Sequence, residues 1–257
     1  MHPLEHPLAG AARTALACLD LTSLNDGDCA ADIERLCERA VGPAWRGAAV
    51  AAVCVWPRFV ALARARLPRT VAVAAVTNFP DGGTDVARAV ADTEAIVAAG
   101  GDEVDVVLPY RDLDAAPALL AAVRRTCDGK RLKVIVESGV LRDAASIRRA
   151  CRMALEAGAD FLKTSTGKTR VGATPAAARL LLDVVAEDPR SRAHAGFKAA
   201  GGVRTVADAA LYIALVAEVL GPGALTPQRF RIGASGLLDD IEAVLGGGPI
   251  PADASDY

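Results

Sequence analysis

The sequence of 257 residues is poor in histidine and has no excess of either charge. Two of its three histidines, His2 and His6, lie near the N-terminus and the third is His194, so no histidine-rich metal site is evident. This disfavours metal-assisted enolisation, and we expect neither a metal ion nor another cofactor. The net charge of −2 comes from 29 basic and 31 acidic residues scattered along the chain. We therefore expect no nucleic acid and no membrane as a partner, whereas a small anionic ligand fits the composition.

The cysteines lack the pattern of a metal site or a redox pair. They include no CxxC pair and are Cys18, Cys29, Cys37, Cys54, Cys127 and Cys151. A chain with 52% hydrophobic residues can bury a core without a disulfide framework, so these thiols should be reduced. The N-terminus carries Glu5 and no basic start, and the longest apolar run, near residues 48–56, is far short of the roughly 20 residues of a membrane helix. We expect a soluble, cytoplasmic protein without a signal peptide.

No proline- or serine-rich linker and no charge run divides the chain. The length suits one α/β barrel or two small domains, and without a linker we expect one domain over residues 1–257. From about residue 246 the sequence contains glycines and prolines without apolar periodicity, which predicts a mobile C-terminal tail.

Short valine-rich runs alternate with longer alanine-rich amphipathic stretches, which is typical of βα units around a parallel sheet. The runs predict eight strands at about 15–20, 48–55, 70–76, 103–108, 131–137, 160–164, 195–199 and 230–234. Helices are expected between them, including 32–40, 84–99, 144–157, 174–186 and 205–220. Several begin at a Ser, Thr or Asp cap, and two end at Gly100 and Gly158. Eight such units predict a TIM (β/α)8 barrel, and an open doubly wound sheet, which shares the local pattern, is the alternative.

Charged residues occupy strands whose neighbours are apolar. Asp105 stands in VDVVL and Lys133 in LKVIVE, while Asp20 and Cys54 lie near the ends of the first two strands. Barrel strands are covered by helices outside and packed inside, so the charges of Asp105 and Lys133 cannot face the helices. They should point into the barrel, near the C-terminal strand ends where barrel enzymes carry out their chemistry.

Two lysines lie on consecutive strands, Lys163 in FLKTSTGK and Lys198 in GFKAAGG. Neighbouring strands are about 4.8 Å apart, and two ammonium groups about 5 Å apart repel by roughly 3 kcal/mol, or about two pKa units. One amine would then be free to attack a carbonyl and form a Schiff base. The alternative is that each lysine is only a paired charge or a phosphate ligand. Asp105 could pair with Lys133 or Lys198, or transfer a proton through water, and these roles are compatible.

Glycine-rich turns follow the last three predicted strands. They are Thr166-Gly167-Lys168, Gly201-Gly202-Val203-Arg204 and Gly233-Ala234-Ser235-Gly236. Glycines let backbone N–H groups converge, and the last strands of a barrel often hold a phosphate group in this way. Three such turns with a lysine and an arginine predict a phosphorylated ligand.

Six segments, FLKTSTGK, GFKAAGGVRT, EVDVVLPYR, LKVIVESG, CLDLTSLN and RIGASGLL, closely resemble those of deoxyribose-phosphate aldolases. The resemblance runs from about Ala15 to Tyr257. It implies a TIM barrel that reversibly cleaves 2-deoxy-D-ribose 5-phosphate into D-glyceraldehyde 3-phosphate and acetaldehyde without a metal. The implied partners are small phosphosugars and aldehydes, and a homo-oligomer is compatible with the sequence. Another class I lyase acting on a keto-acid phosphate, or a phosphosugar-binding barrel without catalysis, is the alternative.

The resemblance also implies roles for individual residues. Lys163 matches the Schiff-base lysine, Lys198 its pKa-lowering neighbour, Asp105 the proton-transfer acid and Lys133 a supporting lysine. The matching phosphate-binding positions are Gly167, Lys168, Gly202, Val203, Arg204, Gly233 and Ser235. A tail tyrosine assists proton transfer in the family, and Tyr257 ends this chain similarly. Two departures are Ala199, where proline is frequent, and Gly236, which removes a serine hydroxyl near the phosphate.

Overall fold

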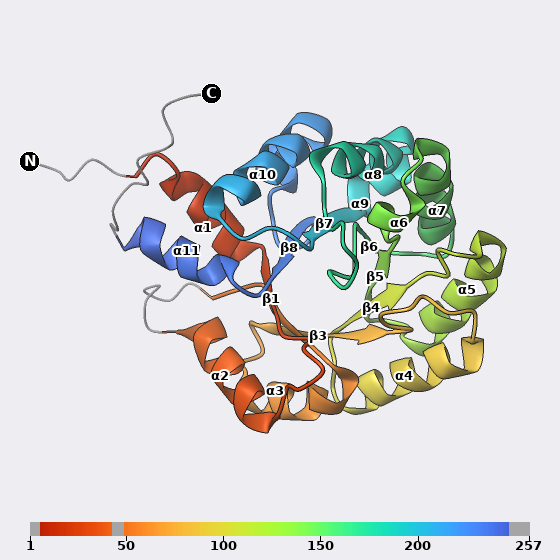
Figure 1. The fold of residues 1–257 in the computed structure, drawn as a ribbon, viewed down its shortest axis with the longest axis horizontal. Coiled ribbons are helices and arrows are strands. Elements are labelled where there is room, and N and C mark those ends of the chain that lie inside the picture. Colours follow the sequence, from red (N-terminus) through yellow and green to blue (C-terminus); the bar gives the residue numbers. More distant parts are fainter. Residues whose placement is uncertain (1–5, 43–48, 247–257) are drawn as a thin grey trace, which may run out of the picture.

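The computed structural model describes residues 6–42 and 49–246, and within these ranges eight parallel strands form a closed barrel (Figure 1). Each strand pairs with the next one along the chain, and β1 also pairs with β8, which closes the sheet. The strands are β1 (Leu19–Thr22), β2 (Ala52–Val55), β3 (Ala72–Thr77), β4 (Glu103–Val107), β5 (Arg131–Ile135), β6 (Phe161–Lys163), β7 (Gly196–Ala200) and β8 (Phe230–Ala234). The predicted TIM barrel is therefore confirmed, and the open sheet is wrong.

Helices connect the strands and surround the barrel (Figure 1). They are α1 (Ala9–Ala17), α2 (Ala30–Val41), α3 (Val60–Arg66), α4 (Val86–Ala98), α5 (Ala116–Thr126), α6 (Ser138–Leu141), α7 (Ala144–Glu156), α8 (Pro175–Glu187), α9 (Pro189–His194), α10 (Val206–Leu220) and α11 (Leu237–Leu245). Short 3-10 turns are η2 (Pro57–Phe59), η3 (Leu113–Ala115) and η4 (Pro222–Ala224). No helix in the described ranges is long and apolar enough to cross a membrane.

The first predicted strand is displaced from the real one. Residues up to Ala17 belong to helix α1, and the strand begins at Leu19. The run is rich in alanine, which favours a helix, and α1 buries its apolar face against α10 and α11. Four other helices begin, as expected, after a Thr or Asp cap, where Asp85, Asp143, Thr174 and Thr205 accept a backbone N–H of the first turn.

Small residues inside the barrel make room for long charged side chains. The interior positions of β2 and β3 include Ala52 and Ala74, and those of β7 and β8 include Gly196 and Gly233. A Cβ atom on Gly196 would lie 2.5 Å from the Phe161 ring, and one on Gly233 would lie 2.9 Å from Cε of Lys198. The interior is thus packed as tightly as an apolar core, although charged groups fill much of it.

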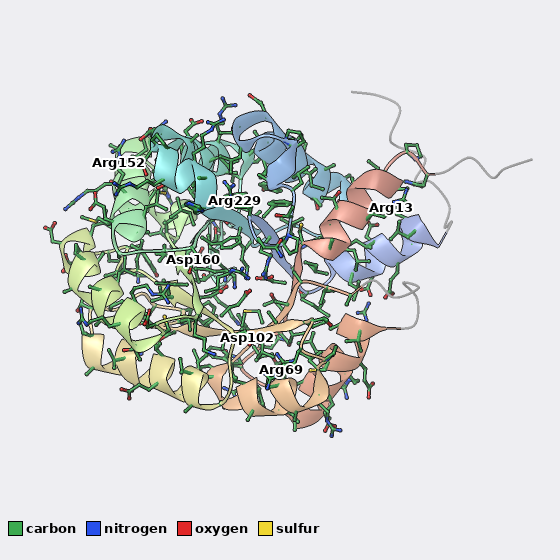
Figure 2. The ribbon with its side chains drawn as sticks, turned by 180° about the vertical axis from the view of Figure 1, so that it is seen from behind. Arg13, Arg69, Asp102, Arg152, Asp160 and Arg229 are labelled. Atoms are coloured by element: carbon green, nitrogen blue, oxygen red, sulfur yellow. The ribbon has the colours of Figure 1, made fainter. Side chains whose placement is uncertain are left out.

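The N-terminal end of the barrel is held by a repeated clamp. Asp102, which precedes β4, accepts hydrogen bonds from Arg64 of α3 and from a backbone N–H of β3. Asp160, which precedes β6, accepts from Arg124 of α5 and from a backbone N–H of β5. Figure 2 shows both aspartates in the barrel region, together with Arg229, which directly precedes β8 and donates to three backbone carbonyls ahead of β7. Each clamp joins one helix to the two strands that follow it.

Candidate active site

Seven charged side chains gather inside the barrel, and each is at most 3% exposed. The carboxylates are Asp20 on β1 and Glu103 and Asp105 on β4; the cations are Lys133 on β5, Lys163 on β6, Lys198 on β7 and Arg231 on β8. We call this set the buried charge network. Parity along the strands turns these residues inward, as predicted for Asp105 and Lys133.

Lys163 and Lys198 are side by side because their strands pair with these two residues in register. Both Nζ atoms donate to the same oxygen of Asp105, Oδ2, at 2.8 Å each. Lys198 has a second partner, Oδ2 of Asp20, at 2.5 Å. Lys163 therefore has only one carboxylate oxygen in the network and shares it with its neighbour.

Lys133 occupies the other side of the central carboxylate. Its Nζ lies 2.7 Å from Oδ1 of Asp105 and 2.5 Å from Oε2 of Glu103. Asp105 thus pairs with three lysines rather than with one, and both of its oxygens are used. This geometry agrees with the predicted salt-bridge role. The proton-transfer role stays a prediction.

Arg231 completes the network from the opposite side of Asp20. Its guanidinium donates to Oδ1 of Asp20 at 2.5 Å and to Glu103 at 2.7 and 3.2 Å, while Nε donates to the carbonyl of Pro227. The Phe161 ring lies 5.8 Å from the guanidinium carbon, within the range of a cation–π contact. Each nitrogen of this buried guanidinium therefore has at least one acceptor.

The pKa values of the lysines separate according to their partners. Burial lowers the pKa of Lys163; Asp105 opposes this shift, and the charge of Lys198 adds to it. Burial also disfavours the charged form of Lys198, but Asp105 and Asp20 outweigh it and raise its pKa. The two pKa shifts have the directions that the prediction of a nucleophilic lysine beside a charged one requires, and the nucleophilic role itself stays a prediction. The predicted cause of the shift at Lys163 was incomplete, because desolvation acts on Lys163 more strongly than repulsion does.

The carboxylates of the network stay ionised in spite of their burial. Burial raises the pKa of Asp105, but Lys133, Lys163 and Lys198 outweigh it, so the value lies well below the usual range. For Glu103 the charges of Lys133 and Arg231 overcome desolvation and lower the pKa to about 2. The cations therefore face fixed negative charges at neutral pH.

A pocket of about 260 Å³ opens beside Lys163 at the C-terminal ends of β6, β7 and β8. Its lining includes all seven residues predicted to hold phosphate: Gly167, Lys168, Gly202, Val203, Arg204, Gly233 and Ser235. It also includes residues that were not among the predicted site residues, among them Thr22 at the end of β1 and Leu24 and Asn25 after it. The structure thus brings the three glycine turns and the amine of Lys163 to one site.

Backbone conformation explains two of the glycines at this pocket. Gly167 and Gly202 have φ angles of 78° and 91°, which L side chains rarely adopt. Gly201 also has a positive φ, and a Cβ atom there would lie 3.1 Å from Cα of Gly172 and 3.2 Å from that of Gly167. The turns after β6 and β7 therefore pack backbone against backbone, which fixes the pocket wall.

Glu137 shapes the same wall and was not among the predicted site residues. It is fully buried, with φ of 51°, and its carboxylate accepts from the hydroxyls of Thr166 at 2.5 Å and Thr169 at 3.2 Å. The Thr166 hydroxyl in turn accepts the backbone N–H of Lys168 at 3.0 Å. Glu137 thus holds the turn that carries Gly167 and Lys168.

Two predicted residues remain, Cys54 and Tyr257, and the structure describes only the first of them. Cys54 is buried beside the network, where burial first and the nearby Asp105 raise the pKa of its thiol, while Lys198 opposes them. Tyr257 lies outside the described residues, so its role stays a prediction. Among residues 6–42 and 49–246 no group of three or more His, Cys, Asp or Glu side chains is arranged to hold a metal ion.

Comparison with known proteins fits this arrangement. Residues 14–240 match the family described as DeoC/LacD family aldolase. The chain belongs to this aldolase family. A curated deoxyribose-phosphate aldolase of Agrobacterium fabrum (strain C58 / ATCC 33970) is 46% identical over 262 residues, which cover 99% of this chain and 98% of the relative.

Solved structures give the same fold. A Toxoplasma gondii ME49 structure with a provisional deoxyribose-phosphate aldolase assignment has a TM-score of 0.83 and 25% identity, covering 95% of this chain and 99% of that one. The tetrameric deoxyribose phosphate aldolase of Aeropyrum pernix has a TM-score of 0.71 at 22% identity, over 92% and 96% of the two chains. The latter likeness supports the fold alone. The family assignment makes the present chain a lyase that cleaves a carbon–carbon bond.

Proposed function

We propose that this aldolase cleaves 2-deoxy-D-ribose 5-phosphate reversibly through a Schiff base on Lys163. The observation that carries the proposal is the position of this amine. It lines the pocket formed by the glycine turns, it shares its single carboxylate oxygen with Lys198, and burial lowers its pKa. An amine of this kind is available as a nucleophile near neutral pH.

The reaction needs one electron sink and several proton transfers. The Lys163 amine adds to the aldehyde carbon of the substrate, and loss of water gives an iminium ion. When the substrate's 3-hydroxyl group loses its proton, the electron pair of the neighbouring carbon–carbon bond moves to the iminium and D-glyceraldehyde 3-phosphate leaves. The remaining enamine takes a proton on carbon, and water releases acetaldehyde and restores the amine.

Asp105 and Lys198 are suited to these proton transfers. Asp105 stays ionised and contacts Lys163, Lys198 and Lys133. A water molecule between Asp105 and the substrate would therefore be polarised by the negative charge of Asp105 and the positive charge of Lys198. Lys198 keeps its charge because two carboxylates hold it, and it therefore favours the neutral form of the amine beside it. Lys133 supports Asp105 from the other side, with Asp20 in the corresponding place behind Lys198.

The glycine turns suit the phosphate group of the substrate. Backbone N–H groups at Gly167 and Gly202 can converge on one anion, and Lys168 and Arg204 add positive charge at the pocket rim. Ser235 supplies a hydroxyl, and helix α11 begins just after it. The site would thus hold the phosphate at one end and the aldehyde carbon at Lys163.

We extend the proposal to location and assembly. Small phosphosugars and aldehydes are the expected partners. All six cysteines are free and five are buried, which supports a reducing compartment such as the cytoplasm. A homo-oligomer is compatible with the tetrameric state of the Aeropyrum pernix protein. Tyr257 is proposed to relay a proton at the enamine carbon.

Trapping of the Schiff base tests the proposal. Acetaldehyde with borohydride should leave an ethyl group on Lys163 alone, detected by peptide mass mapping. Lys163→Arg should abolish both the label and turnover, since arginine keeps the charge but offers no usable amine. A label on Lys198 would reverse the two lysine roles. Loss of activity with a chelator, restored by zinc, would contradict the metal-free mechanism.

A further inference from the structure

The buried charge network holds three carboxylates and four cations, so its charges do not cancel when every group is ionised. Burying an uncompensated charge raises the free energy of the folded state, and deprotonation of one cation removes this cost. Arg131 adds to the positive excess at Glu103, 2.6 Å away, although its side chain is 32% exposed and partly screened by water. The network therefore favours the loss of one proton.

The contacts decide which cation loses its proton. Lys133 contacts Asp105, Glu103 and, at 3.6 Å, Asp20. Lys198 contacts Asp105 and Asp20, and Arg231 contacts Asp20 and Glu103. Each of these three cations therefore has at least two carboxylates. Lys163 has one, and it shares that oxygen with Lys198. A guanidinium does not deprotonate in proteins, so Arg231 holds its charge permanently.

We infer that Arg231 is a positioning residue for Lys163: it supplies the fourth buried cation, and the network is then neutral only when Lys163 is an uncharged amine. The inference rests on the proposed function, because it takes Lys163 as the nucleophile. Arg231 does not line the pocket, so it acts through Asp20 and Glu103 and not on the substrate.

Other titratable groups face Lys163 and Arg231, and their charges enter the same balance. Lys163 faces Asp105, Lys198 and the thiol of Cys54; Arg231 faces Asp20, Glu103 and the thiol of Cys18. Burial raises the pKa of Cys18 to about 12 and that of Cys54 as well, so both thiols stay neutral near pH 7. Among the described groups, the balance is thus set by carboxylates and cations.

The test measures how Lys163 modification by acetaldehyde and cyanoborohydride depends on pH, with peptide mass mapping as the readout. In Arg231→Met one cation is lost, and Lys163 can keep its proton. The rate of labelling at pH 7 should fall about tenfold, the effect of a unit charge roughly 10 Å away at an effective dielectric constant near 20. The rate should recover as the pH rises.

Glu103→Gln removes a carboxylate and should move the same profile to lower pH. The double variant should return towards the wild-type profile, because it loses one charge of each sign. Arg231→Lys keeps the charge and should restore the profile if Arg231 acts through charge. Arg229→Met is the matched control, since Arg229 stands two residues before Arg231 and its guanidinium donates to the backbone carbonyls of residues 192, 193 and 195 and not to the network.

The outcomes separate this inference from the proposed function. If wild-type protein is not labelled on Lys163, the proposed function fails. If Lys163 is labelled but Arg231→Met has the wild-type pH profile, or is slowed equally at every pH, the inference alone is overturned. If Arg231→Met does not fold, Glu103→Gln and Arg231→Lys still decide the question. The inference is overturned if the pH profile of labelling in Glu103→Gln equals that of wild type. It is also overturned if the profile of Arg231→Lys differs from that of wild type.

Discussion

Replacing Lys198 with leucine should raise the pKa of Lys163 and so remove most of its free amine at neutral pH. Lys198 now competes for Oδ2 of Asp105 and repels the neighbouring ammonium. Two ammonium groups roughly 5 Å apart at an effective dielectric constant of about 20 repel by about 3 kcal/mol, or about two pKa units. Without Lys198, the amine fraction at pH 7 should fall about a hundredfold.

Steady-state cleavage of 2-deoxy-D-ribose 5-phosphate between pH 6 and 10 measures this effect. Turnover of Lys198→Leu should be low at pH 7 and recover in part as the pH rises and Lys163 loses its proton. Thermal unfolding provides the control for folding, since Asp20 keeps Arg231 as a partner. Lys168→Leu, at the pocket rim, should leave the pH profile unchanged. A loss in Lys198→Leu that is equal at all pH values would refute the repulsion argument.

Three further predictions concern other parts of the site and the tail. Burial opposes ionisation of Glu103, but the charges of Lys133 and Arg231 outweigh it and lower its pKa from 4.5 to about 2. The ionised carboxylate therefore stabilises the folded state fully above pH 4.5, and this contribution is lost as the pH falls towards 2. Denaturant unfolding of Glu103→Gln should therefore show a deficit of about 3 kcal/mol at pH 7 that shrinks at pH 3. A Cβ atom on Gly236 would have no other atom within 4 Å, so Gly236→Ser can add a hydroxyl at the pocket. This variant should lower KM for the phosphorylated substrate about threefold. An unchanged KM would refute a phosphate contact at this position. Deletion of Tyr257 should slow methyl-proton exchange of acetaldehyde more than it raises that KM, and exchange at the wild-type rate would leave the tail without a role.

Much of the barrel could be predicted because local pattern determines it. All eight strand predictions overlap the observed strands, and the pairing of Lys163 with Lys198 follows from the order of β6 and β7. The first prediction only touched β1, since the alanine-rich residues before Cys18 fold as the end of α1. Helix identity there depends on packing against α10 and α11, which are about 200 residues away in the chain.

The pairing of Glu103 with Arg231 in the buried charge network could not be predicted from local pattern. Glu103 and Arg231 stand in short strands at interior positions, so a buried charge could have been suspected at each. Their pairing joins residues 128 positions apart across the barrel, and no local pattern specifies a contact of that kind. The role of Glu137 was hidden for a similar reason, because it depends on a left-handed backbone after β5 and on the turn after β6.

The two clamps at the N-terminal end divide part of the barrel into two units of the same design. In each, an arginine from one helix and an aspartate two strands further on enclose the strand between them, Arg64 with Asp102 and Arg124 with Asp160. A helix with its two following strands thus carries its own fastening at this end. The buried charge network, by contrast, joins side chains of β1, β4, β5, β6, β7 and β8, so it links the units across the barrel. A change in one clamp should therefore loosen a local part of the barrel, whereas a change in the network should be felt on several strands at once.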